Sequence, residues 1–194
     1  VSLSAAPFRG KSVRGTVFTG YFGRGLWCSV LTLFLLSVPM GSSALGNKQT
    51  PSSSYQDARS AYFSLKGSKK KQRYRHNWFT VIAKFDLVRQ AFPSSPEACR
   101  AVFTSAELWS GLYAVSGLRS DLNRALDAYT DVPELCPKSS LSDDALWAQA
   151  NLLASRSKRH EESKAAIQQL LERYPKGDMA PRARRWARDN QIDL

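Results

Sequence analysis

The chain has 194 residues, of which 43% are hydrophobic, so it can bury the core of one compact domain without disulfides or metals to stabilise it. This excludes the class of small domains that depend on such links. The net charge of +12 indicates attraction to anionic surfaces such as nucleic acid, lipid headgroups or an acidic cell-wall polymer.

An uncharged apolar segment runs from Leu26 to Val38, with Arg24 before it and Pro39 and small residues after it. A basic flank, an apolar centre of this length and small residues at the exit are typical of a secretory signal peptide. We therefore expect cleavage near Ala44 or Gly46 and a periplasmic or secreted protein. A membrane anchor is the alternative, although the segment is shorter than the roughly 20 residues that span a bilayer.

Residues 47–54 are polar and contain Pro51 and three serines, a composition that predicts a flexible linker. From Tyr55 onward the pattern is helical. The sequence thus divides into a signal segment at 1–46, a linker at 47–54 and a helical repeat domain at 55–194.

Apolar residues with helical spacing predict a helix of about five turns, whose buried face would hold Trp78, Val81, Ile82, Phe85, Val88 and Phe92. Pro93 ends this helix, and Ser95 with Pro96 is expected to cap and open the next. Later helices are predicted to begin at Ser120, Ser142, Glu161 and Met179. Ser142 is expected to cap its helix, with Asp143 and Asp144 in the first turn, where their charges oppose the positive end of the helix dipole. No segment alternates as a strand does, so the predicted class is all-α with about seven helices.

Prolines recur at similar helix ends, at Pro93, Pro137 and Pro175, and each is followed by a helix start that contains alanine. Self-similarity at such a period favours stacked antiparallel helix pairs, each of which buries its apolar face against its neighbours. The expected fold is a tetratricopeptide-like right-handed solenoid; an irregular helical bundle is the alternative.

The segment from Asp144 to Pro175 resembles one tetratricopeptide repeat. Trp147 falls at the large position of its first helix, and Ser163 and Ile167 fall at the small and bulky positions of its second. Asn151 and Ala154 depart from the pattern, so the repeat is degenerate.

A wider resemblance extends from Tyr55 to about Arg185. It rests on Leu65 and four segments, Tyr55-Gln56-Asp57-Ala58-Arg59-Ser60-Ala61-Tyr62, Tyr74-Arg75-His76-Asn77-Trp78, Phe92-Pro93-Ser94-Ser95-Pro96 and Leu141-Ser142-Asp143-Asp144-Ala145. These segments resemble the helical N-terminal region of some secreted bacterial N-acetylmuramoyl-L-alanine amidases. The resemblance implies an accessory part of such a protein, without the zinc-dependent domain that cleaves between muramic acid and the peptide stem.

Two cysteines lie in the predicted helical domain, and Cys28 would leave with the signal segment. Cys99 opens one predicted helix and Cys136 closes the next, so an antiparallel hairpin would place them side by side. In an oxidising compartment we expect a disulfide, which would stabilise the fold by about 4 kcal/mol. Two free buried cysteines are the alternative.

The densest positive charge lies at and just before the start of the predicted helix that contains Trp78, at Lys69, Lys70, Lys71, Arg73 and Arg75, beside Tyr74 and Trp78. These residues form a candidate patch for an anionic partner, either peptidoglycan or an anionic membrane surface. The alternative is a solvated loop and first helical turn. Export makes nucleic acid an unfavoured partner.

Catalytic chemistry is not expected. The two histidines, His76 and His160, are far apart in sequence and have no pattern of further ligands around them, whereas a zinc hydrolase needs several. No glycine-rich phosphate loop or paired metal-binding cysteines occur. We therefore expect no catalytic residue, cofactor or metal.

Three functions are consistent with these patterns. The first is a periplasmic tetratricopeptide-like adaptor that binds a protein or peptide partner in the cell envelope. The second is the targeting module of a peptidoglycan amidase that lacks its catalytic domain. The third is a basic helical protein that binds nucleic acid.

Overall fold

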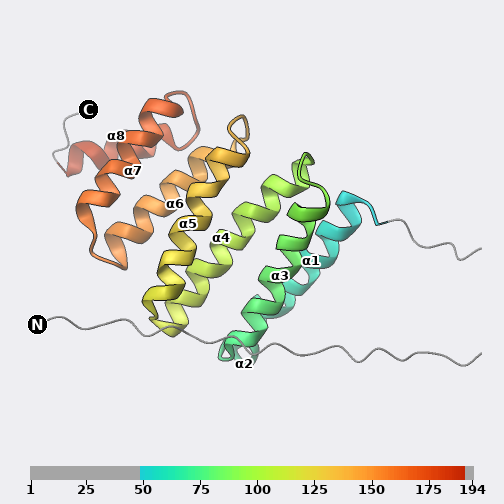
Figure 1. The fold of residues 1–194 in the computed structure, drawn as a ribbon. Helices are drawn as coiled ribbons and strands as arrows, with labels where there is room; N and C mark the ends of the chain where they lie inside the picture. Colours follow the sequence, from blue (N-terminus) through green and yellow to red (C-terminus); the bar gives the residue numbers. More distant parts are fainter. Residues whose placement is uncertain (1–48, 191–194) are drawn as a thin grey trace, which may run out of the picture. The chain divides into compact units, whose positions relative to one another are not determined.

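A computed structural model describes residues 49–190 of the chain, and the signal segment expected at 1–46 lies outside them (Figure 1). The described part contains eight helices and no strand, which confirms the all-α class. The helices are α1 (Pro51–Lys66), α2 (Lys69–Gln72), α3 (Arg75–Ala91), α4 (Pro96–Ser116), α5 (Arg119–Leu135), α6 (Leu141–Ser155), α7 (His160–Arg173) and α8 (Ala180–Asp189).

The predicted linker overlaps the start of α1, because Pro51–Ser54 form its first turn. The Thr50 side chain accepts a hydrogen bond from the Ser53 amide at 3.1 Å, and Ser53 Oγ accepts one from the Thr50 amide at 3.0 Å. This reciprocal cap satisfies free amides of the first turn, and Pro51 has the backbone angle that a first helical position needs. The expectation of a flexible linker through residue 54 was therefore wrong for 51–54.

The eighth helix, beyond the seven predicted, is the single turn α2 in the basic segment. Ser68 caps it by accepting from the Lys71 amide at 3.3 Å. The Gln72 side chain donates to the carbonyls of Leu65 and Lys66, and the Trp78 indole donates to the Gln72 carbonyl at 2.9 Å. These bonds connect the end of α1 to the start of α3.

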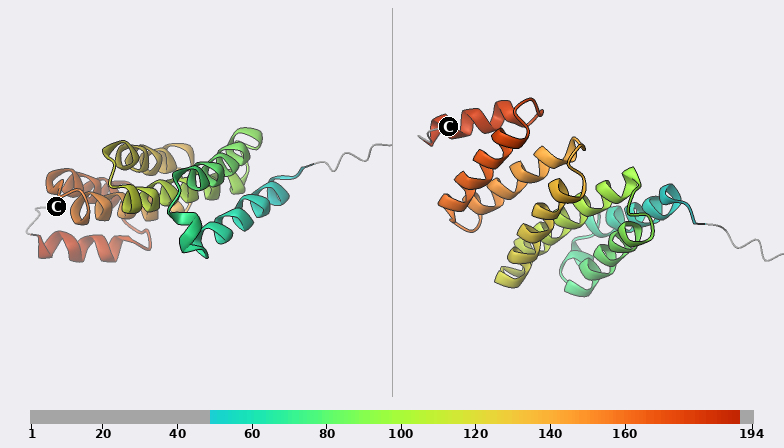
Figure 2. Two further views of the ribbon diagram at one scale, coloured as in Figure 1. Left: turned by 90° about the horizontal axis from the view of Figure 1, so that it is seen from below. Right: turned by 45° about the horizontal axis from the view of Figure 1, so that its top comes forward.

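The helices form three stacked antiparallel pairs, α1 with α3, α4 with α5, and α6 with α7, and α8 packs against α7 (Figure 2). Each pair contacts the next through its neighbouring helices, α3 against α4 and α5 against α6. The first helices of the pairs also touch in turn, α1 against α4 and α4 against α6. The helical-repeat arrangement predicted from the recurring prolines is therefore present.

Two clusters of buried side chains fill the space between the pairs. The first lies between α1, α3 and α4 and includes Trp78, Phe85 and Leu112, while the second extends from α4 to α8 and includes Leu146 and Ile167. The predicted apolar face of α3 is buried from Trp78 to Val88, whereas Phe92, at its end, is half-buried. Helical periodicity thus identified the buried face of α3 correctly.

Ser142 does not cap α6, contrary to the sequence-based expectation. The helix begins one residue earlier, at Leu141, and Ser140 occupies the cap position without a side-chain hydrogen bond. Ser142 is fully buried, and its hydroxyl donates to the Cys136 carbonyl at 2.6 Å. The residue therefore satisfies a carbonyl at the end of α5 instead of an amide at the start of α6.

Replacement of Gly111 by alanine is expected to lower the free energy of unfolding by about 1 kcal/mol. An added Cβ would lie 2.8 Å from Trp78 Cζ3, and the Trp78 ring is held by its indole hydrogen bond to Gln72. Overpacking of this kind costs about 1–3 kcal/mol, partly offset by the better helix propensity of alanine. Urea unfolding of the variant measures the difference.

The matched control for Gly111 is exposed Ala114, also in α4, replaced by glycine. That change carries the propensity penalty of about 1 kcal/mol with no packing change. If Gly111→Ala proved more stable than the parent, the close approach of α4 to Trp78 would be contradicted.

Candidate partner-binding surfaces

A disulfide joins Cys99 in the first turn of α4 to Cys136 at the end of α5, with their Cα atoms 5.9 Å apart. The antiparallel course of these two helices places the first turn of one beside the last turn of the other. This separation is within the range that a disulfide requires. The bond fixes the ends of the second helix pair.

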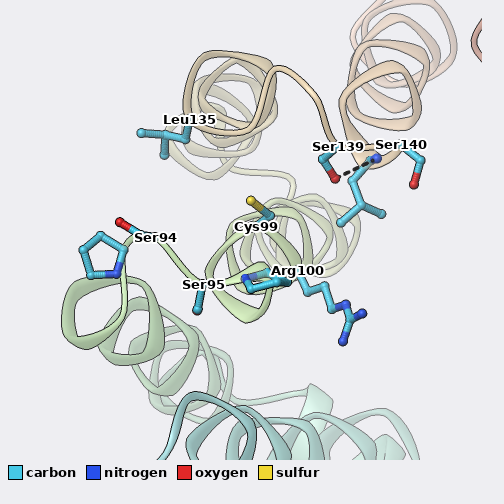
Figure 3. Close-up of a pocket in the computed structure, with 10 residues that line it drawn as sticks. Ser94, Ser95, Cys99, Arg100, Leu135, Ser139 and Ser140 are labelled. Carbon is cyan, nitrogen blue, oxygen red and sulfur yellow. Dashed lines mark hydrogen bonds between the residues drawn. The ribbon is translucent and has the colours of Figure 1, made fainter.

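An open hollow of about 670 Å³ lies beside the disulfide, between the α3–α4 and α5–α6 turns (Figure 3). Its lining includes Cys99, Arg100, exposed Leu135 and several serines from both turns. None of its lining residues is Asp, Glu or His. The hollow offers hydroxyls and one guanidinium for binding a polar group but no side chain for general base chemistry.

The five residues of the predicted basic patch are all near the α1–α3 connection, but they have different environments. Arg75 forms an ion pair with buried Asp121 of α5 at 2.7 Å, and its guanidinium lies 5.2 Å from the centre of the Phe79 ring. Lys71 Nζ donates to Ser64 Oγ at 2.6 Å. These two side chains therefore have structural partners within the domain.

Lys69, Lys70 and Arg73 are exposed and form no ion pair with any residue that the structure describes. From Ala58 to Phe85 the sequence contains no Asp or Glu, so no acid close in sequence offsets their charge. The part of the patch that remains open to a partner is thus the α2 turn.

A second candidate surface is the face where α1, α4 and α6 lie next to one another, here called the first-helix face and marked by Tyr62, Glu107 and Asp144. Burial raises the pKa of Glu107 from its usual value, and nearby Asp144 raises it further, while Lys66 opposes the change. Burial and then Glu107 raise the pKa of Tyr62 and that of Tyr129. These residues share one electrostatic environment although they belong to four different helices.

The acidic character of this face continues toward α8. Burial raises the pKa of Asp144, the neighbouring Asp178 and Asp143 add to the effect, and Arg182 opposes it. Burial also raises the pKa of Asp143, whose carboxylate accepts a hydrogen bond from the Met179 amide at 3.0 Å. Asp143 therefore connects α6 to the turn before α8, whereas Asp144 has no ion pair among the described residues.

Sequence reasoning missed the first-helix face. The position of Asp144 predicts only a first-turn acid, and Tyr62, Glu107 and Tyr129 lie in ordinary helical segments. No local pattern joins them, because their proximity arises from the stacking of pairs.

His76 and His160 are both exposed, and the first lies near the ring of Tyr74. Within residues 49–190 no group of three or more His, Cys, Asp or Glu side chains is arranged to hold a metal ion. None of the described helices has the length and apolarity needed to cross a membrane.

The stacked pairs and their open surfaces define an all-α helical-repeat protein. No protein family model matches the sequence. No curated protein is significantly similar to it.

Proposed function

We propose that the protein is a non-catalytic, exported helical-repeat adaptor of the cell envelope that binds a protein or peptide partner on the first-helix face. The partner contributes a Lys or Arg side chain to Glu107 and Asp144. The amidase resemblance suggests that this occurs near the peptidoglycan layer.

The observation that carries the proposal is the placement of two carboxylates, Glu107 on α4 and Asp144 on α6, near each other on one face with no ion pair to either in the described part of the chain. Burial raises the pKa of both. Partly desolvated carboxylates favour a nearby positive charge, and ionisable groups kept in such a state are frequent at functional sites. Lys66 lies near one end of the face and Arg182 near the other, but neither forms an ion pair with these acids in the described part of the chain. Tyr62 and half-buried Trp147 add aromatic surface, which is common in binding sites.

Two features support export. The disulfide between Cys99 and Cys136 suits an oxidising compartment, because cytosolic thiols are normally kept reduced. The apolar segment from Leu26 to Val38 has the flanks of a secretory signal. Fractionation of a host that expresses the tagged full-length chain tests this part, and unprocessed chain retained in the cytosol would contradict it.

The variant Glu107→Gln is expected to raise the free energy of unfolding at neutral pH by about 0.5 kcal/mol, a small amount because much of the residue is exposed. An acid whose pKa is higher in the folded than in the unfolded protein binds more protons when folded, so it lowers stability as pH rises above the ordinary value of 4.5. The gain should disappear below that pH. Thermal unfolding across the acid range measures it, and a loss of stability at neutral pH would contradict the assignment.

Site-specific photocrosslinking in the expressing cells tests the proposed function. A benzophenone amino acid at exposed Ala114 lies two helical turns after Glu107 and so on the same face of α4. The matched control is exposed Ala165 on α7. We expect a defined protein adduct from position 114 only.

The charge requirement is tested in the same cells with Glu107→Lys/Asp144→Lys. This double substitution should abolish the adduct at position 114, because it replaces both acids with cations. An adduct that persists in this variant, or one that forms equally at 165, would overturn the proposal.

A further inference from the structure

The turns within the helix pairs all lie at one edge of the described array, here called the within-pair edge, which comprises residues 66–75, 116–120 and 155–160. Two contacts hold these turns together. Arg75, in the first turn, forms an ion pair with Asp121, which follows the second turn. The hydroxyl of Tyr113, just before the second turn, donates to the Arg156 carbonyl in the third turn at 3.3 Å. The turns between pairs, at 92–95, 136–140 and 174–179, lie at the opposite edge (Figures 1 and 2).

Positive charge is concentrated on the within-pair edge. Its three turns contain ten Lys and Arg and no Asp or Glu, whereas the turns of the opposite edge contain two lysines and one aspartate. Asp121 pairs with Arg75, and Glu162 pairs with Arg159. Most of the positive charge on this edge therefore remains without an acid partner in the described structure.

Exposed apolar side chains are concentrated at the same edge. Seven large hydrophobic residues are exposed in the described part of the chain, and five of them lie at or within four residues of these turns. They are Phe63, Tyr74, Phe79, Val115 and Leu118, with Phe63 57% and Tyr74 52% exposed. Basic and aromatic side chains are thus neighbours in the segment around α2.

A hollow of about 330 Å³ lies between the second and third turns of this edge. Arg119, Arg156 and Arg159 line it together with Tyr113. Arginine presents several donors in a planar arrangement that suits phosphate oxygens. Arg159 is paired with Glu162, so Arg119 and Arg156 supply the donors with which this hollow would contact a phosphate-bearing headgroup.

We propose that the within-pair edge binds the surface of a bilayer rich in anionic phospholipid. Basic residues near such a surface are attracted to it, and aromatic side chains favour the boundary between headgroups and acyl chains. The exposed apolar residues favour a bilayer over a soluble anionic polymer, since a polymer offers no apolar layer to receive them. The edge adjoins the first-helix face at Lys66, but binding to a bilayer requires no protein partner on that face, so this inference does not depend on the proposed function.

Vesicle flotation with the full-length chain tests the proposal. The vesicles contain phosphatidylglycerol in one arm and phosphatidylcholine alone in the other, and any contribution of residues 1–48 is common to all variants. We expect Lys69→Gln/Lys70→Gln/Arg73→Gln to weaken binding to the anionic vesicles about a hundredfold, or about fivefold per residue. Higher salt should weaken binding by the parent.

The matched control is Lys84→Gln/Lys138→Gln/Lys176→Gln, which removes three exposed lysines away from this edge. It should change binding less than threefold; an equal loss in both triple variants would overturn the proposal. Circular dichroism confirms that each variant is folded.

A second pair of measurements separates a bilayer from an anionic polymer. Phe63→Gln/Tyr74→Gln keeps every charge and should weaken binding to anionic vesicles about tenfold, with no change in binding to polyphosphate. If this variant bound the vesicles as the parent does, the edge would be a site for soluble polyanions and the bilayer proposal would be wrong.

Discussion

Replacement of both Cys99 and Cys136 by serine is expected to lower the free energy of unfolding by about 4 kcal/mol. The disulfide links residues 37 apart in sequence. In the chain-entropy model, a closed loop of this size lowers the conformational entropy of the unfolded chain, which raises the free energy of unfolding by about 4 kcal/mol. The folded state should change little, because α4 and α5 pack along their lengths. The corresponding fall in the unfolding midpoint is on the order of 10 °C.

Reduction of the parent protein provides the matched comparison. A thiol reductant should lower the midpoint of the parent to near that of the double serine variant and leave the variant unchanged. Both samples have the same helices and differ only in the link, so circular dichroism at low temperature should be the same. A midpoint of the parent that does not respond to complete reduction would contradict the stabilising role.

Helix positions could be predicted because their signals are local. The apolar spacing from Trp78 to Val88 and the pair Ser95-Pro96 act within a few residues, and the structure places them as expected. Thr50 with Ser53 is also a local signal, but a serine in place of the usual Glu or Gln made that cap easy to overlook.

The candidate surfaces depend on proximity that sequence spacing does not specify. The Ser142 hydroxyl could cap a helix, yet it donates to the Cys136 carbonyl because the α5–α6 turn places that carbonyl beside it. Glu107 and Asp144 influence each other only because α4 lies against α6. Among the five basic residues of the predicted patch, sequence alone could not separate Arg75, which pairs with Asp121, from exposed Lys69 and Lys70.

Arg75→Ala is expected to lower the free energy of unfolding by about 3 kcal/mol. Asp121 is fully buried, and its carboxylate accepts only from Arg75 at 2.7 Å and Ser116 Oγ at 2.6 Å among the described side chains. Loss of the guanidinium leaves a buried charge with a single hydroxyl donor. The partial exposure of Arg75 places the cost at the lower end of that expected for a broken buried pair.

Asp121→Asn should cost less, about 1–2 kcal/mol, because the freed Arg75 can be solvated while the buried carboxylate cannot. The double variant Arg75→Ala/Asp121→Asn should lose about 1–2 kcal/mol less stability than the sum of the two single variants, because neither remaining side chain carries an unpaired buried charge. Urea unfolding of the four proteins gives this coupling energy. Simple additivity would show that the ion pair does not link the first helix pair to the second.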